Sequence, residues 1–472
     1  MDSQIIEFLS KKQIKVIAED IATKLEVWDA WYKGKVDNFH SYTVNGGKKK
    51  IKKRRRTLNM AARVCQDWAD LLLNEKVSIK VADEETQKVL NRLLNQVNFY
   101  VKGNNLIEAA FAKGGGFLIQ YFDGKKVNQK YITQDFMYPI SFDSGKLTEA
   151  AFASEKTIKG KRYVYLETHI MGEGGLYKVE NYLLEKDDKG LKEVPMDFYE
   201  KEEIETLIET GSPYPSFQMI RPNIANKDRF NSAFGTSVFS GATDILEGTD
   251  IAYDTYVNEI VLGRKRIFAH DGVTNVHYDE EGNSQKVFDP NDDVFYLLPA
   301  SSDDKAPPII ESNMQLRTAE LDAAMQTQLN LLSQACGFGA NGYKWDSGNV
   351  STATQVISEN SKMFRTLKKH EEVLRSAIID MAHSLLMFEV KYNDKLKGKI
   401  KPEQEITVDF DDSIIEDTAE KKRQALLEYN AGLIDEVEYF IKAYNMTEKQ
   451  AQEHCKKIRE RRPPIETEPE GT

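Results

Sequence analysis

Five carboxylates gather in a short segment near the C-terminal end of the chain: Asp409, Asp411, Asp412, Glu416 and Asp417. Carboxylate oxygens are the ligands that hard divalent cations prefer, and such a group could hold a metal ion for nucleic-acid hydrolysis. No histidine accompanies them at a recognisable spacing. A strand end followed by an acidic helix start explains the same residues, because carboxylates favour a helix N-terminus. We therefore predict no bound metal, and a metal-dependent nucleic-acid enzyme using residues 409–417 stays the alternative hypothesis.

The glycine-rich segment Gly337-Phe-Gly339-Ala-Asn-Gly342 has the spacing of a dinucleotide-binding fingerprint. That fingerprint requires a strand before the glycines and a helix directly after them. Here a helical pattern precedes the glycines, and nine residues separate them from the next helix. The P-loop, the Gly-x-Ser-x-Gly elbow and the His-Glu-x-x-His motif do not occur in the sequence either. We therefore predict no cofactor and no catalytic residue, and the chain is not expected to be an enzyme.

The loop from Phe338 to Ser351 carries three side chains suited to a large ligand, because Asn341 is polar, Lys344 is cationic and Trp345 is flat. Glycines in the same loop let the backbone come close to a surface. Two interpretations stay open from the residues alone: a loop that contacts a large partner, and a solvated loop with a buried tryptophan.

Charge is distributed unevenly along the chain. The run Lys48 to Arg56 has eight basic residues in nine positions, which is typical of a phosphate-binding arm, a nuclear signal or a solvated loop. Between residues 237 and 262, carboxylates recur at near-helical spacing, namely at Asp244, Glu247, Asp250 and Glu259, with Asp254 on the adjoining face. An ordinary solvated face explains this row. The alternative is a wall of a DNA passage, where carboxylates would repel phosphates and keep the polymer from sticking.

The composition is that of a globular protein. The chain has 472 residues, a formal net charge of −11, 40% hydrophobic and 29% charged residues, which excludes a wholly disordered chain. A sequence pI near 5.4 argues against a protein that wraps tightly around nucleic acid. The three cysteines, Cys65, Cys336 and Cys455, lie far apart and predict neither a disulfide framework nor a zinc site.

Targeting signals are also missing from the sequence. No apolar run approaches the roughly 20 residues that a membrane-spanning helix needs, and the first residues lack the layout of a signal peptide. We therefore expect synthesis in the cytosol and no membrane partner.

The residue pattern predicts an α+β region up to about residue 220. Amphipathic helices are expected around 5–21 and 58–72, followed by strands around 117–122, 126–133, 163–166 and 177–182, with a hairpin turn at Asp123-Gly124.

Longer helices and a strand-rich insert follow. One helix is predicted from Ser237 to Leu262, ending at Gly263 before Arg264, Lys265 and Arg266, whose positive charge suits a helix C-terminus. Strands and turns are expected over 264–316, and a second helix ends at Gly337.

The longest predicted helix begins with a capping box formed by Thr352 and Gln355. If it runs to about Tyr392, it is roughly 60 Å long. A strand at 406–410, shorter helices with a second capping box at Thr447 and Gln450, and a disordered tail after Pro463-Pro464 complete the prediction.

In this order, the elements resemble those of the portal proteins of tailed bacteriophages, in particular phages that infect Gram-positive bacteria. The similarity covers most of the chain and is carried by the following segments: Ile220-Arg-Pro-Asn-Ile-Ala-Asn226, Phe234-Gly-Thr-Ser-Val-Phe239, Asp250 to Tyr253, Asn258-Glu-Ile-Val-Leu-Gly-Arg-Lys-Arg-Ile267, Cys336-Gly-Phe-Gly339, Thr352-Ala-Thr-Gln-Val-Ile-Ser-Glu-Asn360, Phe136-Met-Tyr-Pro139 and Phe152-Ala-Ser154. Gln355 stands where the family has glutamate, a change that preserves the capping role.

The resemblance implies an α+β portal-like fold assembled as a ring, with long stem and wing helices, a β-containing clip and a helical crown. The implied parts are a wing over 1–235, a first stem helix over 236–263, a clip over 264–316, a second stem helix over 317–337, a tunnel loop over 338–351, a long helix with the C-terminal part of the wing over 352–412, and a helical crown with a disordered tail over 413–472.

The resemblance also implies a role and partners. Typically twelve copies form a ring at one vertex of the capsid, through which double-stranded DNA is packaged and later ejected. Such a ring nucleates head assembly with scaffold and major capsid protein, and it docks the terminase large subunit and then the head–tail adaptor. The protein is expected in the virion, at the portal vertex, after synthesis in the cytoplasm of the bacterial host. A separate ATPase would supply the energy, which agrees with the missing P-loop.

Site residues follow from the same resemblance. Asn341, Lys344 and Trp345 would form the part of the tunnel loop that faces DNA. Asp244, Glu247, Asp250 and Glu259 would line the channel in the first stem helix. Arg264, Lys265 and Arg266 would lie at the base of the clip.

Overall fold

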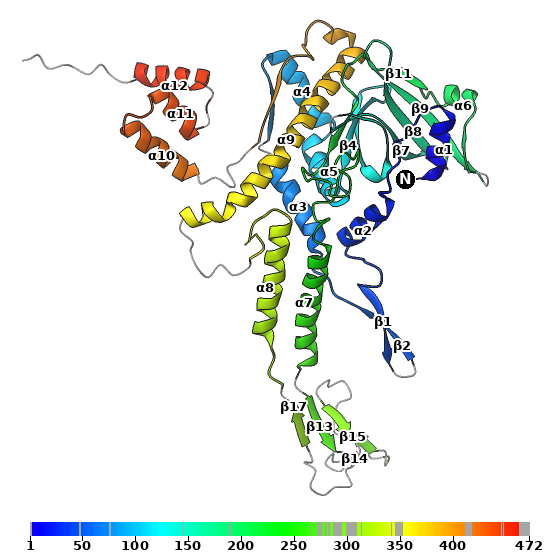
Figure 1. Ribbon diagram of the computed structural model, residues 1–472, viewed down its shortest axis with the longest axis vertical. Helices are drawn as coiled ribbons and strands as arrows, with labels where there is room; N and C mark the ends of the chain where they lie inside the picture. Colours follow the sequence, from blue (N-terminus) through cyan, green and yellow to red (C-terminus); the bar gives the residue numbers. More distant parts are fainter. Residues whose placement is uncertain are drawn as a thin grey trace, which may run out of the picture.

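The computed structural model describes residues 2–46, 49–74, 77–143, 145–187, 190–264, 266–270, 276–278, 281, 284–286, 295–298, 309–312, 314–340, 342–344, 353–410, 418–444, 446 and 448–461. Figure 1 shows a broad body from which two paired helices, α7 and α8, run away together to a small group of strands. A separate group of three helices, α10 to α12, lies to one side of the body (Figure 1).

The first part of the body is mainly helical. Its elements are α1 (Ser3–Lys11), α2 (Ala22–Tyr32), β1 (Ser41–Gly46), β2 (Lys49–Arg54), α3 (Met60–Leu72), β3 (Ser78–Val81), α4 (Glu84–Gln96) and α5 (Phe99–Lys113). Asp83 caps α4, because its side chain accepts hydrogen bonds from the backbone N–H and the hydroxyl of Thr86. α5 ends at Gly114, whose φ of +90° is a conformation that glycine adopts easily.

Strands form the second part of the body. They are β4 (Gly116–Phe122), β5 (Val127–Thr133), β6 (Met137–Asp143), β7 (Lys146–Ile158), β8 (Lys161–Met171), β9 (Tyr177–Asp187), β10 (Gly190–Glu193), β11 (Leu207–Glu209) and β12 (Phe217–Ile220), with the short helices η1 (Gln134–Phe136) and α6 (Met196–Lys201) between them. One sheet has the order β10-β9-β8-β7-β6 with β11 on β9, and another has the order β12-β4-β5. The hairpin expected at Asp123-Gly124 is confirmed, since β4 and β5 pair antiparallel on either side of it.

The chain then leaves the body and returns to it. α7 (Thr243–Leu262) leads to β13 (Arg266–His270), β14 (Val276–Tyr278), β15 (Ser284–Lys286), β16 (Phe295–Leu298) and β17 (Ile309–Ser312), and α8 (Thr318–Ala335) leads back. Among the described strands of this group, β13 lies between β16 and β17, and β14 pairs with β15. The predicted insert of strands between two helices is therefore confirmed.

The longest helix, α9 (Ala353–Tyr392), ends at Tyr392 as predicted and crosses the body (Figure 1). It is followed by η3 (Asp394–Leu396), β18 (Ile406–Asp409), α10 (Thr418–Asn430), α11 (Glu436–Tyr444) and α12 (Glu448–Arg461). β18 pairs with β3, a strand more than 300 residues earlier in the chain. The capping residues Thr352 and Thr447 and the tail after Pro463-Pro464 lie outside the described residues.

The main core lies where α9 packs against α3, α5 and the β4 sheet. Trp68, Phe111, Phe117 and Phe388 are fully buried there, together with Ile378. Apolar residues at three- and four-residue spacing on α3 and α9 place these side chains on one face of each helix. This core closes on residues of one chain, from the N-terminal helices to β18.

The prediction of a helix from Ser237 was wrong by six residues, because α7 begins at Thr243. Residues 237–242 form turns tied to α5: the hydroxyl of Ser237 and the backbone N–H of Val238 both donate to the carbonyl of Phe111. Phe239, which fits the helical pattern, is instead buried in the core as part of this turn. Tertiary hydrogen bonds and burial therefore outweighed local periodicity at this helix start.

Within the described residues, no helix combines the length and the apolarity that crossing a membrane would require.

Candidate functional site

The paired helices α7 and α8 are held together at points along their length. Gly248 of α7 lies against Gln328 of α8, where an added Cβ would meet the amide oxygen at 2.7 Å. Near the far end, Arg317 donates to both carboxylate oxygens of Glu259, at 3.2 and 2.9 Å. The hydrogen bonds and the charge of Arg317 lower the pKa of Glu259. This bidentate pair joins the end of one helix to the start of the other, beside the strand group.

The predicted acidic row of α7 divides into different environments. Asp244 and Glu247 are exposed, and Glu259 is half-buried beside Arg317. Asp250 is buried, and both of its oxygens accept hydrogen bonds from groups of the same chain. The expectation that Asp250 presents its carboxylate to an open channel is therefore corrected, because the side chain points into the protomer.

Three polar residues spaced four apart on α7 hold the segment that precedes α3. Asp250 accepts from the backbone N–H of Leu58 at 2.9 Å. Asp254 accepts from both the backbone and the guanidinium of Arg56, and Asn258 accepts from the same guanidinium at 2.9 Å. Residues four apart on a helix share one face, so a single stripe of α7 carries all of these bonds. The conspicuous basic run therefore ends in an arginine that ties the chain to α7.

His40 completes this attachment. The backbone N–H of Val36 donates to Nδ1 of His40, so this nitrogen must be the acceptor. Nε2 then carries the hydrogen and donates to Asp250 Oδ2 over 2.9 Å. Both side chains are buried. The geometry is that of a structural bond between the base of β1 and the middle of α7.

The basic run was expected as a loop or arm, and it forms the strand β2. β1 and β2 pair antiparallel, with Val44 opposite Ile51, and all six residues of β2 are exposed. The base is fixed by Arg55, whose guanidinium lies 4.2 Å from the ring centre of Phe39. A signal was present in the sequence: Ser41-Tyr-Thr-Val44 is rich in β-forming residues, and the Gly46-Gly47 pair after it suits a hairpin turn.

The loop after α8 begins inside the core. Phe338 stacks on Trp68 with ring centres 4.4 Å apart, and Trp68 Nε1 donates to the carbonyl of Cys336. Gly337 and Gly339 have φ values of +94° and +89°, a left-handed conformation that a larger residue would adopt only with strain. These glycines bend the backbone around the anchored ring of Phe338, which explains the spacing that resembles a nucleotide-binding motif.

A second anchor follows four residues later. The carbonyl of Tyr343 accepts from Gln326, and Gly342 N–H donates to Ser333 Oγ, both on α8. Burial raises the pKa of the Tyr343 hydroxyl far above its usual range. Lys344 comes directly after this anchor and is exposed. Asn341 and Trp345 lie outside the described residues, so of the three predicted loop residues the structure places Lys344.

The structure describes two of the three cations predicted at the base of the clip. Arg264 is exposed directly after the helix, and Arg266 is the first residue of β13. Lys265 lies outside the described residues.

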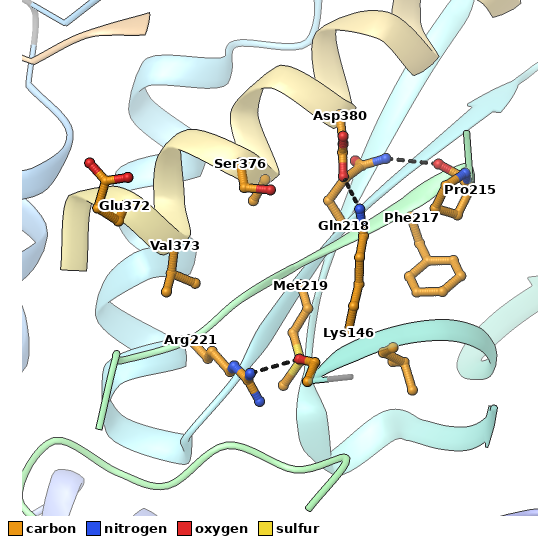
Figure 2. A pocket seen from close by; sticks show the side chains of 13 residues that line it. Lys146, Pro215, Phe217, Gln218, Met219, Arg221, Glu372, Val373, Ser376 and Asp380 are labelled. Atoms are coloured by element: carbon orange, nitrogen blue, oxygen red, sulfur yellow. Dashed lines mark hydrogen bonds and ion pairs between the residues drawn. The ribbon is translucent and has the colours of Figure 1, made fainter. Parts of the chain in front are cut away.

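A hollow of about 350 Å³ lies between α9 and β12. Figure 2 shows Lys146 and Asp380 meeting across it, and their charged atoms are 2.7 Å apart. Arg221 donates to the carbonyl of Gly145 at its other end, and burial lowers the pKa of this arginine. The charged groups of Lys146, Asp380 and Arg221 all bond to other groups of the body. We therefore assign this hollow a structural role and assign no catalytic role to the residues that line it.

The acidic segment gives no support for a metal centre. Asp409 pairs with Lys80 at 2.6 Å across the β3–β18 ladder, and residues 411–417 lie outside the described part. Within that part, no three residues among the histidines, cysteines and carboxylates come together in a way that would hold a metal ion.

A family model described as phage portal protein, SPP1 Gp6-like, matches residues 11–464. Among solved structures, a chain from "Virion of native gene transfer agent (GTA) particle" superposes with a TM-score of 0.43 and 11% sequence identity, covering 81% of this chain and 88% of that one. The search of curated proteins gives no match.

Proposed function

Because this chain belongs to the SPP1 Gp6-like phage portal protein family, we propose that copies of it form a ring at one vertex of a capsid, with α7 and α8 as the wall of a DNA channel. The family is structural, and in this proposal the chain acts as a conduit and assembly platform without an enzymatic step of its own. We propose twelve copies as the ring size, following the family resemblance.

One observation carries the proposal: the paired helices expose large apolar side chains that the described part of the chain does not cover. Ile251 and Leu262 of α7 are 46% and 62% exposed, and Leu331 of α8 is 45% exposed. Asp244, Ile251, Thr255 and Leu262 follow helical spacing along one exposed stripe of α7. A helix that is apolar on several sides is normally covered, and neighbouring copies in a ring would cover these faces.

Charge favours a passage through which DNA slides. Within their helical bounds, α7 and α8 carry seven carboxylates and no lysine or arginine. Carboxylates repel phosphates, so a channel lined by these helices would not hold DNA by release of counterions. Asp244 and Glu247 are the exposed members of the predicted row that suit such a wall.

The loop after α8 is proposed to approach the DNA. Phe338 and Tyr343 anchor its start, which leaves the cation of Lys344 exposed beyond a fixed support. We propose that Lys344, with Asn341 and Trp345, contacts the polymer, and that the strand group after Arg264, Lys265 and Arg266 docks the terminase large subunit and later the head–tail adaptor. Scaffold and major capsid protein are the proposed partners during head assembly.

The purified full-length chain tests the proposal directly by negative-stain microscopy and native mass spectrometry. We expect annular particles with a central hole and a mass near twelve copies. Monomers or dimers at every salt and protein concentration, with no annular particle, would overturn the proposed function.

Lys344→Ala tests the loop within a particle. We expect less packaged DNA per particle and unchanged ring assembly, because the substitution removes one exposed cation after the anchors. Lys125→Ala, at the exposed β4–β5 turn, is the matched control. Unchanged packaging and retention in Lys344→Ala would remove the support for direct contact by this loop.

The enzyme alternative has its own test. A Mg²⁺-dependent cleavage of DNA that disappears in Asp409→Asn would favour it, and the pairing of Asp409 with Lys80 gives no reason to expect such an activity.

A further inference from the structure

We propose that the β1–β2 hairpin of one copy docks on the first half of α8 in the adjacent copy, where its lysines meet Glu320 and Asp322. This inference rests on the proposed ring and assigns a role to the basic run.

The hairpin has a surface without a partner in its own chain. Lys49, Lys50, Lys52, Lys53 and Arg54 all belong to β2, every residue of which is exposed, and no ion pair described for this chain involves them. The sequence has no acidic residue from position 38 to position 66. The hairpin is therefore a projecting element whose charged side chains are all positive.

One face of the hairpin carries apolar side chains beside two of the lysines, Lys49 and Lys53. Val44 and Ile51 lie directly opposite each other, so their side chains point to the same face, and Tyr42 lies two residues before Val44 on that face. Ile51 is 48% exposed. A two-stranded hairpin is marginally stable in water unless something packs on it, which predicts that this face is covered in the assembled protein.

The first half of α8 offers the matching surface. Glu320 and Asp322 are exposed, and no ion pair described for this chain involves either carboxylate. Ala319, Ala323 and Ala324 are exposed beside them, leaving room for larger side chains of a partner. This surface is acidic with small apolar residues, and the hairpin is basic with larger apolar residues.

The two surfaces lie on opposite sides of one copy. On one side, Gly248 and Glu259 of α7 and Gly263 after it contact α8 and the two residues before that helix. On the other side, α7 holds the base of the hairpin through Asp250, Asp254 and Asn258. At 3.6 residues per turn these two sets are centred roughly 150° apart around the helix. Figure 1 shows the same order, with α8, α7 and the hairpin following one another across the view.

Ring symmetry then brings the surfaces together. A head-to-tail ring joins one side of a copy to the opposite side of the next. If the ring axis is parallel to the paired helices, the rotation from one copy to the next leaves the position of each residue along that axis unchanged. The pairings of Gly248 with Gln328 and of Glu259 with Arg317 set Asp254 level with about residue 322 of α8. Because Asp254 holds the base of the hairpin, this base is level with Asp322 of the adjacent α8, and the two strands run from there toward the start of that helix (Figure 1).

Cross-linking between two variants that each carry one added cysteine tests the contact. Ile51→Cys and Ala323→Cys are purified separately, mixed under ring-forming conditions and treated with a short bismaleimide; Cys65, Cys336 and Cys455 are buried. We expect a cross-linked dimer from the mixture and none from either variant alone. A mixture of Lys125→Cys with Ala323→Cys is the control.

Charge exchange tests the pairing. Lys49→Glu with Lys53→Glu, whose side chains lie on the same face as Ile51, should raise the protein concentration needed for half-assembly by roughly tenfold, and adding Glu320→Lys with Asp322→Lys in the same chain should restore it. Lys125→Glu with Lys399→Glu, both exposed and outside the hairpin, should leave assembly unchanged.

The outcomes are distinguishable. Intact rings without the cross-link, and with assembly unaffected by the lysine reversals, would overturn the docking while leaving the proposed ring in place. If the reversals spare the ring but lower the retention of duplex DNA and its salt dependence, a nucleic acid is the ligand of the hairpin and the docking is wrong. Failure of the unmodified chain to form rings would overturn the proposed function and the docking with it.

Discussion

The second half of α9 and the whole of α7 are both helical and rich in apolar residues. They differ in how far the rest of the chain buries those residues. On α9, Leu374, Ile378, Met381, Leu385 and Phe388 are all buried by other parts of the same chain. On α7, Leu246 is buried, whereas Ile251, Ile260 and Leu262 are exposed. Similar residue content therefore leads to a finished core in one region and an open surface in the other.

This difference teaches that the two regions have different sources of stability. The body has enough apolar surface on its own chain to close a core. α7 and α8 pack against each other and the base of the hairpin, and several of their apolar side chains stay exposed. We expect substitutions in the body to change the folding of the protomer, and substitutions on the paired helices to change assembly.

The largest effect should come from Trp68→Ala. This substitution removes a fully buried ring, its stacking on Phe338 and its hydrogen bond to the carbonyl of Cys336. We expect the free energy of unfolding of the body to fall by about 3–5 kcal/mol, measured by urea denaturation of the full chain. A loss below about 1 kcal/mol would show that the body is not the closed core inferred from α9.

Acid should weaken the body next. Burial lowers the pKa of His370 to about 4 and that of His169 to about 3. In the unfolded chain both titrate near the ordinary value of about 6.5, so below that pH the unfolded state binds protons that the folded state refuses. Stability should be constant above about pH 7.5 and fall as pH drops, by about 3 kcal/mol at pH 4 from His370 alone.

Urea midpoints between pH 7.5 and pH 4.5 measure this effect. His370→Asn keeps an oxygen that can accept from the backbone N–H of Asn223, the bond that His370 Nδ1 now makes. The variant should show a shallower decline than the natural chain. An equal decline in both would exclude His370 as a source of the acid sensitivity.

A smaller effect, on assembly rather than folding, is expected from Leu331→Ser. The side chain is exposed in the protomer, so the urea midpoint of the protomer should barely change. If an adjacent copy covers it, the substitution removes burial worth about 1–2 kcal/mol per contact, and rings should need a higher protein concentration by roughly tenfold. Val101→Ser, at an exposed position of α5, is the matched control. Equal behaviour of the two variants in sedimentation velocity would contradict the division between regions.

The smallest effect should come from Arg56→Ala at the joint between the regions. Its guanidinium is partly exposed, so the loss of its bonds to Asp254 and Asn258 should cost less than about 1 kcal/mol. Amide hydrogen exchange in β1 and β2 should nevertheless become faster, because the base of the hairpin loosens. Unchanged exchange would indicate that His40 and Arg55 hold the hairpin without Arg56.

Much of the fold was predictable because it depends on local patterns. The helical period from residue 353 to 392, the Asp123-Gly124 hairpin and the strands between α7 and α8 are all written in short-range spacing. The start of α7 was not predictable in this way, because the bonds of Ser237 and Val238 to Phe111 join positions more than 120 residues apart.

The sequence predicted the residue types of the candidate site better than it predicted the role of each residue. The sequence placed acidic residues on α7 and a lysine beyond the glycines of the loop, and both features stand. It did not distinguish Asp250, which is buried against His40, from Asp244, which is exposed. Helical spacing assigns a face to each residue, but what packs on that face comes from distant segments.

The sequence by itself determined that this chain makes two apolar and acidic helices around a strand-rich insert, then a glycine-bent loop and a third, longer helix, since each follows from local chemistry and periodicity. The tertiary structure decided which of those apolar faces are closed. The body closes its own because β18 and α9 return to the N-terminal helices, whereas α7 and α8 extend away from the body and leave theirs open. The tertiary structure also decided the conformation of the basic run, which forms one strand of a hairpin. The base of this hairpin is fixed because Asp250, Asp254 and Asn258 of α7 hold the segment that follows β2.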